Sequence, residues 1–255
     1  MDDRQIDPSE EAPEQHSLTI PQVVDLLREG EMEVKGMLPW SSNYTFLGQI
    51  HKDELAAMVV YKPRRGERPL WDFPSGSLYR REAAAFLISD ALEWNIIPPT
   101  VARDGEHGIG MVQLFIEHDP EEHFFTFRDP WPEELTLIAL FDVLVNNADR
   151  KGGHCLRDAQ GRIWAIDHGL CFHEEPKLRT VIWETAGQPI PETLLDDLRR
   201  LQLCLKAEQP LREKLNRLLP PKEIRALQQR LAELLQTEQF PLPPPERRHI
   251  PWPMV

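Results

Sequence analysis

Apolar residues recur at helical spacing in six parts of the chain, where every third or fourth position is hydrophobic. The stretch SLYRREAAAFLISDALEW, residues 77–94, predicts a long helix with Ser77 as its N-cap. The stretch PEELTLIALFDVLVNN, residues 132–147, is apolar around most of its circumference and predicts a buried helix. The same spacing predicts helices over 19–31, 191–206, 210–219 and 221–236.

Strand patterns lie mainly in the first half of the chain. Residues 45–63 predict two strands around the turn HKDE, and residues 107–117 predict another. A short hairpin with the turn DAQG is expected over residues 155–167. The order predicts an α+β fold with two lobes: an antiparallel N-lobe sheet with one long helix, then a mainly helical C-lobe.

Composition divides the chain into four parts. Residues 1–17 form an acidic stretch that we expect to be disordered, since six acids and one Arg fall within its first 16 positions. We place the N-lobe at 18–117 and the C-lobe at 118–238. Residues 239–255 form a proline-rich C-terminal tail, which cannot make a helix or an inner strand.

With a net charge of -13, the chain lacks the excess of basic residues that is typical of a nucleic-acid-binding protein. No nucleic-acid partner is therefore expected. No apolar run approaches the length of a membrane span, which predicts no stable membrane insertion. The N-terminal sequence has no apolar core of a signal peptide. The three cysteines are odd in number and lack the spacing of a disulfide framework, which is typical of a cytoplasmic protein.

Two polar clusters follow buried elements, and they indicate the chemistry. In VNNADRKGGHCL, Asp149 follows the apolar helix, and in IWAIDHGLCF, Asp167 follows the second strand of the hairpin. Upstream, Lys62 ends the apolar strand MVVYK, and Glu82 lies near the start of the long helix. Phosphoryl transfer needs a cation for the phosphates, a carboxylate to hold it, a metal-binding acid and an acid for the attacking hydroxyl.

In this order, Lys62, Glu82, NADRKGGH and IDHG resemble the protein-kinase-like superfamily, in its phosphatidylinositol 3-/4-kinase-like branch. The motifs are similar to those of type II phosphatidylinositol 4-kinases and of a bacterial phosphatidylinositol-kinase-like family. The resemblance covers roughly residues 30 to 205. It implies ATP and a divalent metal, Mg²⁺ or Mn²⁺, as cofactors.

The resemblance also implies a role for each matched position. Lys62 would contact the nucleotide phosphates and pair with Glu82, Asp149 would be the catalytic carboxylate, and Asp167 would bind the metal. Residues 147–154 would be the catalytic loop and residues 171–192 the activation segment. The backbone of the hinge, Phe115, Ile116 and Glu117, would hold adenine. Phosphate would also be held at the first strand turn, by Ser41, Ser42 and Asn43.

One position departs from the pattern. His154 stands where those kinases have a metal-binding Asn. An imidazole can bind a transition metal but suits Mg²⁺ less well than oxygen does. Three alternatives stay open: His154 binds a metal such as Mn²⁺, Asn147 or water replaces it, or catalysis is impaired. With an ordinary imidazole pKa, a ligating His154 predicts that activity falls below about pH 6.5.

Simpler interpretations exist for single residues. Arg150 could be a solvated charge, Asn146 and Asn147 could cap a helix C-terminus, and Trp71 would pack in the core or between lobes together with Trp94, Trp131, Trp164 and Trp183. HGLCFH, together with His154 and Cys155, could form a structural zinc site, although no CxxC is present.

The sequence therefore predicts an ATP-dependent kinase that transfers phosphate to a hydroxyl acceptor, with a nucleotide-binding pseudokinase or regulator as the alternative. The activation segment contains only Lys177 and Arg179 as cations among several acids. Since a phosphoinositide headgroup calls for a basic cluster, a protein or small-molecule acceptor is favoured over a lipid.

Overall fold

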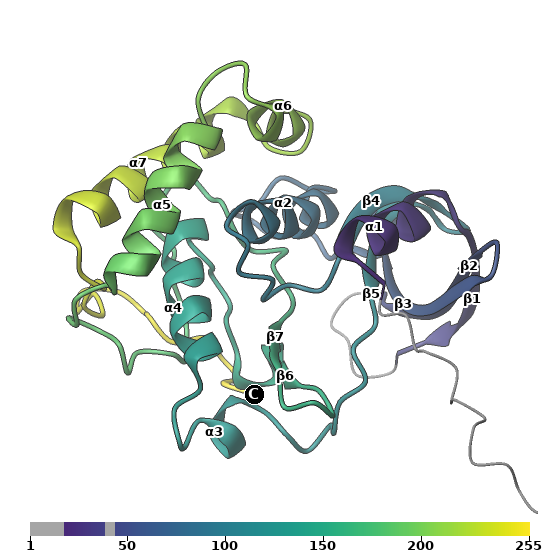
Figure 1. Cartoon of the computed structure of the whole chain (residues 1–255), viewed down its shortest axis with the longest axis horizontal. Helices are drawn as coiled ribbons and strands as arrows, with labels where there is room; N and C mark the ends of the chain where they lie inside the picture. The colour runs from purple at the N-terminus through teal and green to yellow at the C-terminus, as the bar shows by residue number, and fades with distance from the viewer. Residues whose placement is uncertain (1–17, 39–43) are drawn as a thin grey trace, which may run out of the picture.

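The computed structural model describes residues 18–38 and 44–255 (Figure 1). Ser41, Ser42 and Asn43 lie outside the described residues. The strands β1 to β5 gather in one part of the molecule, the helices α4, α5 and α7 in another, and α2 lies between them (Figure 1). This arrangement confirms the predicted two-lobed α+β architecture.

The N-terminal sheet has five antiparallel strands in the order β1-β2-β3-β5-β4. The predicted strands are present as β2 (Phe46–Lys52), β3 (Leu55–Pro63) and β5 (Gly108–Leu114). The sheet also contains β1 (Glu31–Met37) and β4 (Thr100–Gly105), which the sequence patterns did not predict. β3 is the central strand, and it places Lys62 opposite Met111 of β5.

The helix α1 (Ile20–Glu29) covers the sheet, as its amphipathic pattern predicted. Its buried residues Val23, Leu26 and Leu27 belong to a small core with Ile50 and Tyr61 of the sheet. This core holds the sheet in place, and one of its strands, β3, carries Lys62.

The helix α2 (Leu78–Ala91) is buried on nearly all sides and carries Glu82. Ser77 stands at the N-cap position, but its hydroxyl donates to the carbonyl of Pro74 and does not cap the helix. The carboxylate of Glu67 accepts the N–H groups of Leu78 and Tyr79 instead, at 3.1 and 2.9 Å. A residue from the preceding loop therefore anchors the start of the helix.

The C-terminal part surrounds the predicted buried helix, α4 (Glu133–Val145). It includes α3 (Phe124–Phe127), the hairpin β6 (Cys155–Arg157) and β7 (Ile163–Ala165), and the helices α5 (Glu192–Cys204), α6 (Pro210–Asn216) and α7 (Pro221–Thr237). Two single 3-10 turns cover Arg64–Gly66 and Gly152–His154. The larger hydrophobic core joins these helices to α2. The division of the chain at residue 117 stays a prediction, since α2 packs into this core.

Three other expectations can be compared with the structure. Asn146 does cap α4 in the left-handed conformation, at φ 56°. Trp71 was expected to be packed, but its side chain is 93% exposed, because it lies in the loop before α2. Within the described residues, no helix is long and apolar enough to cross a bilayer.

Candidate active site

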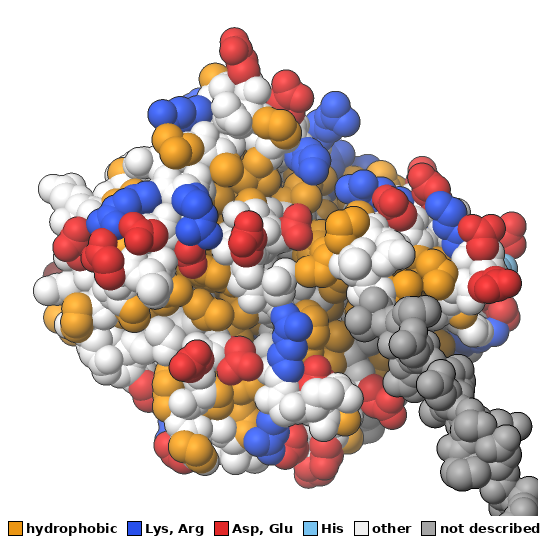
Figure 2. Space-filling view, viewed as in Figure 1, with side chains coloured by type: hydrophobic (Ala, Val, Ile, Leu, Met, Phe, Trp, Pro, Cys, Tyr) orange, Lys and Arg blue, Asp and Glu red, His pale blue; other side chains and the backbone are white. Residues whose placement is uncertain are grey.

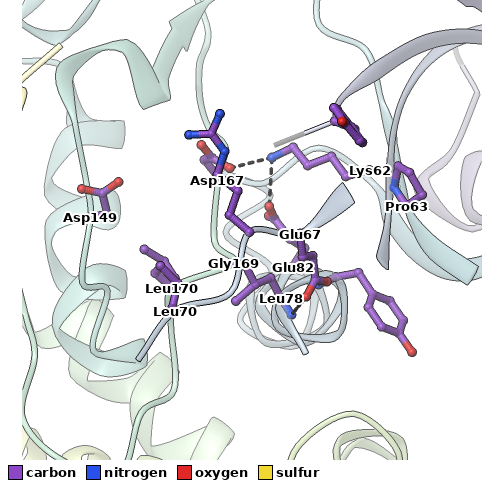
Figure 3. Close-up of a pocket in the computed structure, with 13 residues that line it drawn as sticks. Lys62, Pro63, Glu67, Leu70, Leu78, Glu82, Asp149, Asp167, Gly169 and Leu170 are labelled. Atoms are coloured by element: carbon purple, nitrogen blue, oxygen red, sulfur yellow. Dashed lines mark hydrogen bonds and ion pairs between the residues drawn. The ribbon is translucent and has the colours of Figure 1, made fainter. Parts of the chain in front are cut away.

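Lys62 links the two lobes at the centre of the molecule. Its ammonium lies 3.0 Å from Oε1 of Glu82 on α2 and 2.6 Å from Oδ1 of Asp167, which follows β7 (Figure 3). The second oxygen of Glu82 accepts the backbone N–H of His168 at 2.8 Å. Residues separated by up to 105 positions in the sequence therefore meet around one cation.

Lys62 stabilises both carboxylates electrostatically, while the like charges of Glu82 and Asp167 repel each other. Burial alone would lower the pKa of Lys62, but the carboxylates of Asp167 and Glu82 raise it well above its ordinary value. Burial raises the pKa of Glu82, and Lys62 opposes that effect. Burial also acts to raise the pKa of Asp167, but Lys62 lowers it well below its ordinary value. At neutral pH, Lys62 is thus a fixed cation and Asp167 a fixed anion.

Asp149 lies in the turn after α4 and lines the same cavity as Lys62 and Asp167. Asn147 shapes this turn, because its side-chain oxygen accepts the N–H of Asp149 at 3.0 Å. The ammonium of Lys151 is 3.4 Å from the Asp149 carboxylate. Burial is the main cause that raises the pKa of Asp149, which makes it a better proton acceptor than an exposed aspartate.

Arg150 is fully buried, so its interpretation as a solvated charge is wrong. Its guanidinium forms an ion pair with Asp142 at 2.9 Å and donates to the carbonyls of His154 and Ile166 at 3.1 and 2.8 Å. It also contacts Nε2 of His168 at 2.7 Å. Because arginine only donates, this nitrogen accepts, and the ring of His168 is neutral. Arg150 thereby ties the catalytic loop to the segment after β7 that carries Asp167.

His154 is directed at Asp167, with Nε2 3.2 Å from Oδ2. Nδ1 of the same ring accepts the backbone N–H of Lys151 at 3.4 Å. In the neutral ring the proton is therefore on Nε2, and it points at the carboxylate. Burial lowers the pKa of His154 to about 4. The ordinary pKa behind the expected loss of activity near pH 6.5 thus does not apply to this residue.

The cavity between the lobes has a volume of about 200 Å³. Leu70, Leu78 and Leu170 give it apolar walls, and Asp149 faces Lys62 and Asp167 across it (Figure 3). The hinge residues Phe115, Ile116 and Glu117 are outside its lining. Phe115 donates its N–H to Met58 of β3 at 2.9 Å. Among the described residues, no protein acceptor receives the N–H of Ile116 or Glu117.

The donor atoms around the cavity suit a hard divalent cation. The Asp167 side chain is 44% exposed and that of Asp149 28% exposed, so carboxylate oxygens remain accessible. In the described part of the chain, no three His, Cys, Asp or Glu side chains are grouped to hold a metal by themselves. This composition fits Mg²⁺, which is commonly bound by one or two carboxylates plus phosphate oxygens and water. It does not favour zinc, since burial raises the pKa of the Cys155 thiol to about 12.

Two buried residues beside the site were not predicted. Arg81, next to Glu82 on α2, donates to the carboxylate of Glu223 on α7 at 2.6 Å. Its guanidinium also donates to the carbonyl of Cys171 in the activation segment at 2.6 Å. Its neighbour Glu82 holds Lys62 and the N–H of His168, so α2 is attached to the C-lobe at two successive positions. The sequence places Arg81 in an apolar helix but carries no signal for a partner 142 residues away.

The sheet, the central helix and the lysine–carboxylate centre define the class of protein: a kinase-like protein. The sequence model of the family Phosphatidylinositol 3- and 4-kinase matches residues 23–219, and the chain belongs to this family. A Mycobacterium tuberculosis protein, Protein Rv2133c, is 40% identical over 89% of this chain and 94% of its own length. Phosphatidylinositol 4-kinase gamma 4 of rice, Oryza sativa subsp. japonica, is 27% identical over 44% of this chain but only 24% of that protein.

Two solved structures share the fold. The Helicobacter pylori proinflammatory kinase CtkA superposes with a TM-score of 0.51 at 12% identity, covering 84% of this chain and 94% of the other. Hydra Fam20, solved with sugar, superposes with a TM-score of 0.54 at 14% identity, covering 86% and 88%. These superpositions show a kinase-like fold, and identities this low leave the substrate of this chain open.

Proposed function

We propose that this protein transfers the γ-phosphoryl group of ATP, with a divalent metal, to a hydroxyl acceptor. The observation that carries the proposal is Lys62, which bridges Glu82 and Asp167 at the wall of a cavity that Asp149 also lines. Phosphoryl transfer depends on the positioning of such charges more than on covalent chemistry by the protein.

Each residue has one task in this proposal. Lys62 binds the nucleotide phosphates, and Glu82 orients its ammonium. Asp167 would supply carboxylate oxygens to Mg²⁺ or Mn²⁺, which would neutralise phosphate charge when bound. Asp149 accepts the proton of the acceptor hydroxyl. The hydroxyl oxygen then bonds to the γ-phosphorus as the bond between that phosphorus and the bridging oxygen of the β-phosphate breaks. We assign adenine to the N–H groups of Ile116 and Glu117, which no acceptor within the described residues receives.

His154 has a positioning role in this proposal. Its Nε2–H holds the second oxygen of Asp167 while Lys62 holds the first. A ring that donates to Asp167 does not present a lone pair there, so a bound metal would take its ligands from carboxylate, phosphate and water oxygens. The same contact is what favours the second candidate, a nucleotide-binding pseudokinase, because it occupies an oxygen that the metal would otherwise bind.

The acceptor is a protein or a small hydrophilic molecule in our proposal. Lys177 of the activation segment is only 12% exposed and is paired with Asp72 at 3.0 Å, so it is not presented to a headgroup. On the face shown in Figure 2, basic and acidic side chains alternate and no single basic patch is seen. Such a mixed surface does not favour an anionic lipid or a nucleic acid.

Nucleotide binding is tested by calorimetry and by thermal unfolding with ATP and Mg²⁺ or Mn²⁺. A ligand that binds only the folded state raises Tm, by an amount that grows with its concentration. We expect a Tm increase with ATP plus metal and a much smaller one for Lys62→Met. If millimolar ATP with either metal gives neither heat nor a change in Tm, the proposed function is wrong.

A further inference from the structure

The C-terminal tail does not leave the molecule after α7. Phe240 is buried and exchanges two backbone hydrogen bonds with the loop before α5, donating to Gln188 at 3.0 Å and accepting from Gly187 at 3.1 Å. Residues 247–255 then return to the catalytic loop and the activation segment, and the chain ends beside β6 (Figure 1). We name residues 247–255 the strap.

One contact of the strap is made with the catalytic loop. The N–H of Gly152 donates to the carbonyl of Met254 at 2.7 Å. A Cβ at position 152 would lie 2.9 Å from the ring of Phe125 and 3.4 Å from that carbonyl. The ring of Phe125 therefore packs against Gly152, where a larger residue would force it to move, while the strap carbonyl lies at ordinary contact distance. Gly152 lies three residues after Asp149 and two before His154, within the loop that forms the site.

The other contacts are made with the activation segment. The carbonyl of His249 accepts the N–H of Thr180 at 3.0 Å and Nε1–H of Trp183 at 3.2 Å. The rings of Trp183 and His249 also pack edge to face, with centroids 5.7 Å apart. Arg247 donates to the carbonyl of Pro176 at 2.8 Å.

The segment that the strap holds is the one that supports the catalytic loop. The N–H of Arg150 donates to the carbonyl of Arg179 at 3.0 Å, and the N–H of Val181 donates to the carbonyl of Arg150 at 3.1 Å. Thr180 lies between these two bonds and points its own N–H to the strap. Catalytic loop, activation segment and strap thus lie side by side as three hydrogen-bonded layers of backbone.

From these contacts we propose that the strap is a positioning segment of the phosphotransfer site. The carbonyls of His249 and Met254 hold the activation segment and the catalytic loop in the geometry that directs Asp149 toward the acceptor. Residues 239–255 contain no Ser, Thr or Tyr, so the strap offers no hydroxyl to accept phosphate. Pro251 and Pro253 lie between the two anchoring carbonyls and restrict the strap before it docks.

The inference rests on the proposed function. Two measurements distinguish a failure of the strap's positioning role from a failure of the proposed function. The first uses the full chain and a chain that ends at Glu246. Hydrogen exchange should be faster in the truncated chain at the amides of Gly152 and Thr180, with the sheet unchanged. Unchanged exchange at both amides would overturn the proposal without reference to any activity.

The second measurement is ADP formation from ATP with Mg²⁺, with nucleotide affinity measured separately by calorimetry. The truncated chain should lose turnover by about 100-fold, as expected for a misplaced catalytic group, while its affinity changes little. A synthetic peptide of residues 239–255 added in trans should restore part of the turnover. Absence of ATP binding in the full chain contradicts the proposed function; equal or higher turnover in the truncated chain contradicts the positioning role.

Point variants cover the case in which truncation prevents folding. Trp183→Phe removes one donor to the carbonyl of His249 but keeps an aromatic ring, and His249→Ala removes the packed ring. Both should reduce turnover more than affinity. Leu242→Ala is the matched control, since this tail side chain is 71% exposed and outside the strap. If Trp183→Phe and His249→Ala both turn over ATP as fast as Leu242→Ala and the unmodified protein, the strap has no positioning role.

Discussion

The buried ion pair between Arg81 and Glu223 allows a quantitative test of how α2 is held. Their side chains are 1% and 2% exposed, and the pair joins α2 to α7 beside the site. Replacing Arg81 by Met keeps most of the volume but leaves the Glu223 carboxylate buried without its cation. Breaking a buried pair from one side costs about 3–5 kcal/mol of unfolding free energy. For a chain of this size, that lowers Tm by about 10 °C.

Two further variants are compared with the loss of unfolding free energy expected for Arg81→Met. Arg81→Met combined with Glu223→Leu removes both charges, and apolar replacement of a buried pair is often neutral or stabilising. The carbonyl of Cys171 still loses its donor, so we expect the double variant to remain about 1 kcal/mol below the unmodified protein. Arg80→Met is the matched control, because Arg80 is exposed on the same helix and its loss should change stability by less than about 0.5 kcal/mol.

Urea denaturation followed by circular dichroism measures these differences, with the m-value checked for constancy. A loss of less than about 1 kcal/mol for Arg81→Met would contradict our reasoning about burial. A double variant as unstable as the single one would show that the guanidinium matters for its other contacts and not for the charge pair.

Three further outcomes are expected. Lys62→Met should weaken ATP binding at least about tenfold by calorimetry, because it removes the cation between Glu82 and Asp167; unchanged affinity would place the phosphates elsewhere. Asp149→Asn should bind ATP normally but lose phosphate transfer, and equal transfer in both proteins would remove Asp149 from its role. His154 has a pKa lowered to about 4, so its contribution to stability is complete above pH 6.5 and is lost as pH falls toward 4. His154→Asn should therefore flatten the pH dependence of Tm between pH 6.5 and 4; an unchanged profile would mean that His154 does not titrate in this range.

The sequence predicted those elements whose signal is local. The apolar patterns of 77–94 and 132–147 correspond to α2 and α4, and the strands on both sides of the turn HKDE are present. β1 was missed because it is an edge strand with no fully buried position, and its alternation of Met32 and Val34 with charged residues covers only its first five positions. β4 was missed because it is short and ends in the polar sequence ARDG.

The part of the site that the sequence could not predict depends on distant partners. The order of Lys62, Glu82, Asp149 and Asp167 predicted a common site, and the structure brings all four to one cavity. Nothing local shows that Arg150 is buried against Asp142 and two carbonyls.

Trp71 illustrates the opposite error. Its size predicted packing, yet it lies exposed with the ammonium of Lys177 5.1 Å from the centre of its ring. Hydrophobicity alone does not reveal which aromatic residues remain at the surface.

The central claim is tested most directly by mass spectrometry after incubation with ATP and Mg²⁺ or Mn²⁺. The purified protein is incubated alone, with cell extract, and with vesicles that contain phosphatidylinositol, and each reaction is repeated with Asp149→Asn. Our account predicts a mass increase of one phosphate on a protein or small hydroxyl compound, present with the unmodified protein and absent with Asp149→Asn. Phosphate on the lipid alone would contradict our choice of acceptor. ATP binding without phosphate on any component, in either protein, would contradict phosphotransfer and identify a nucleotide-binding pseudokinase.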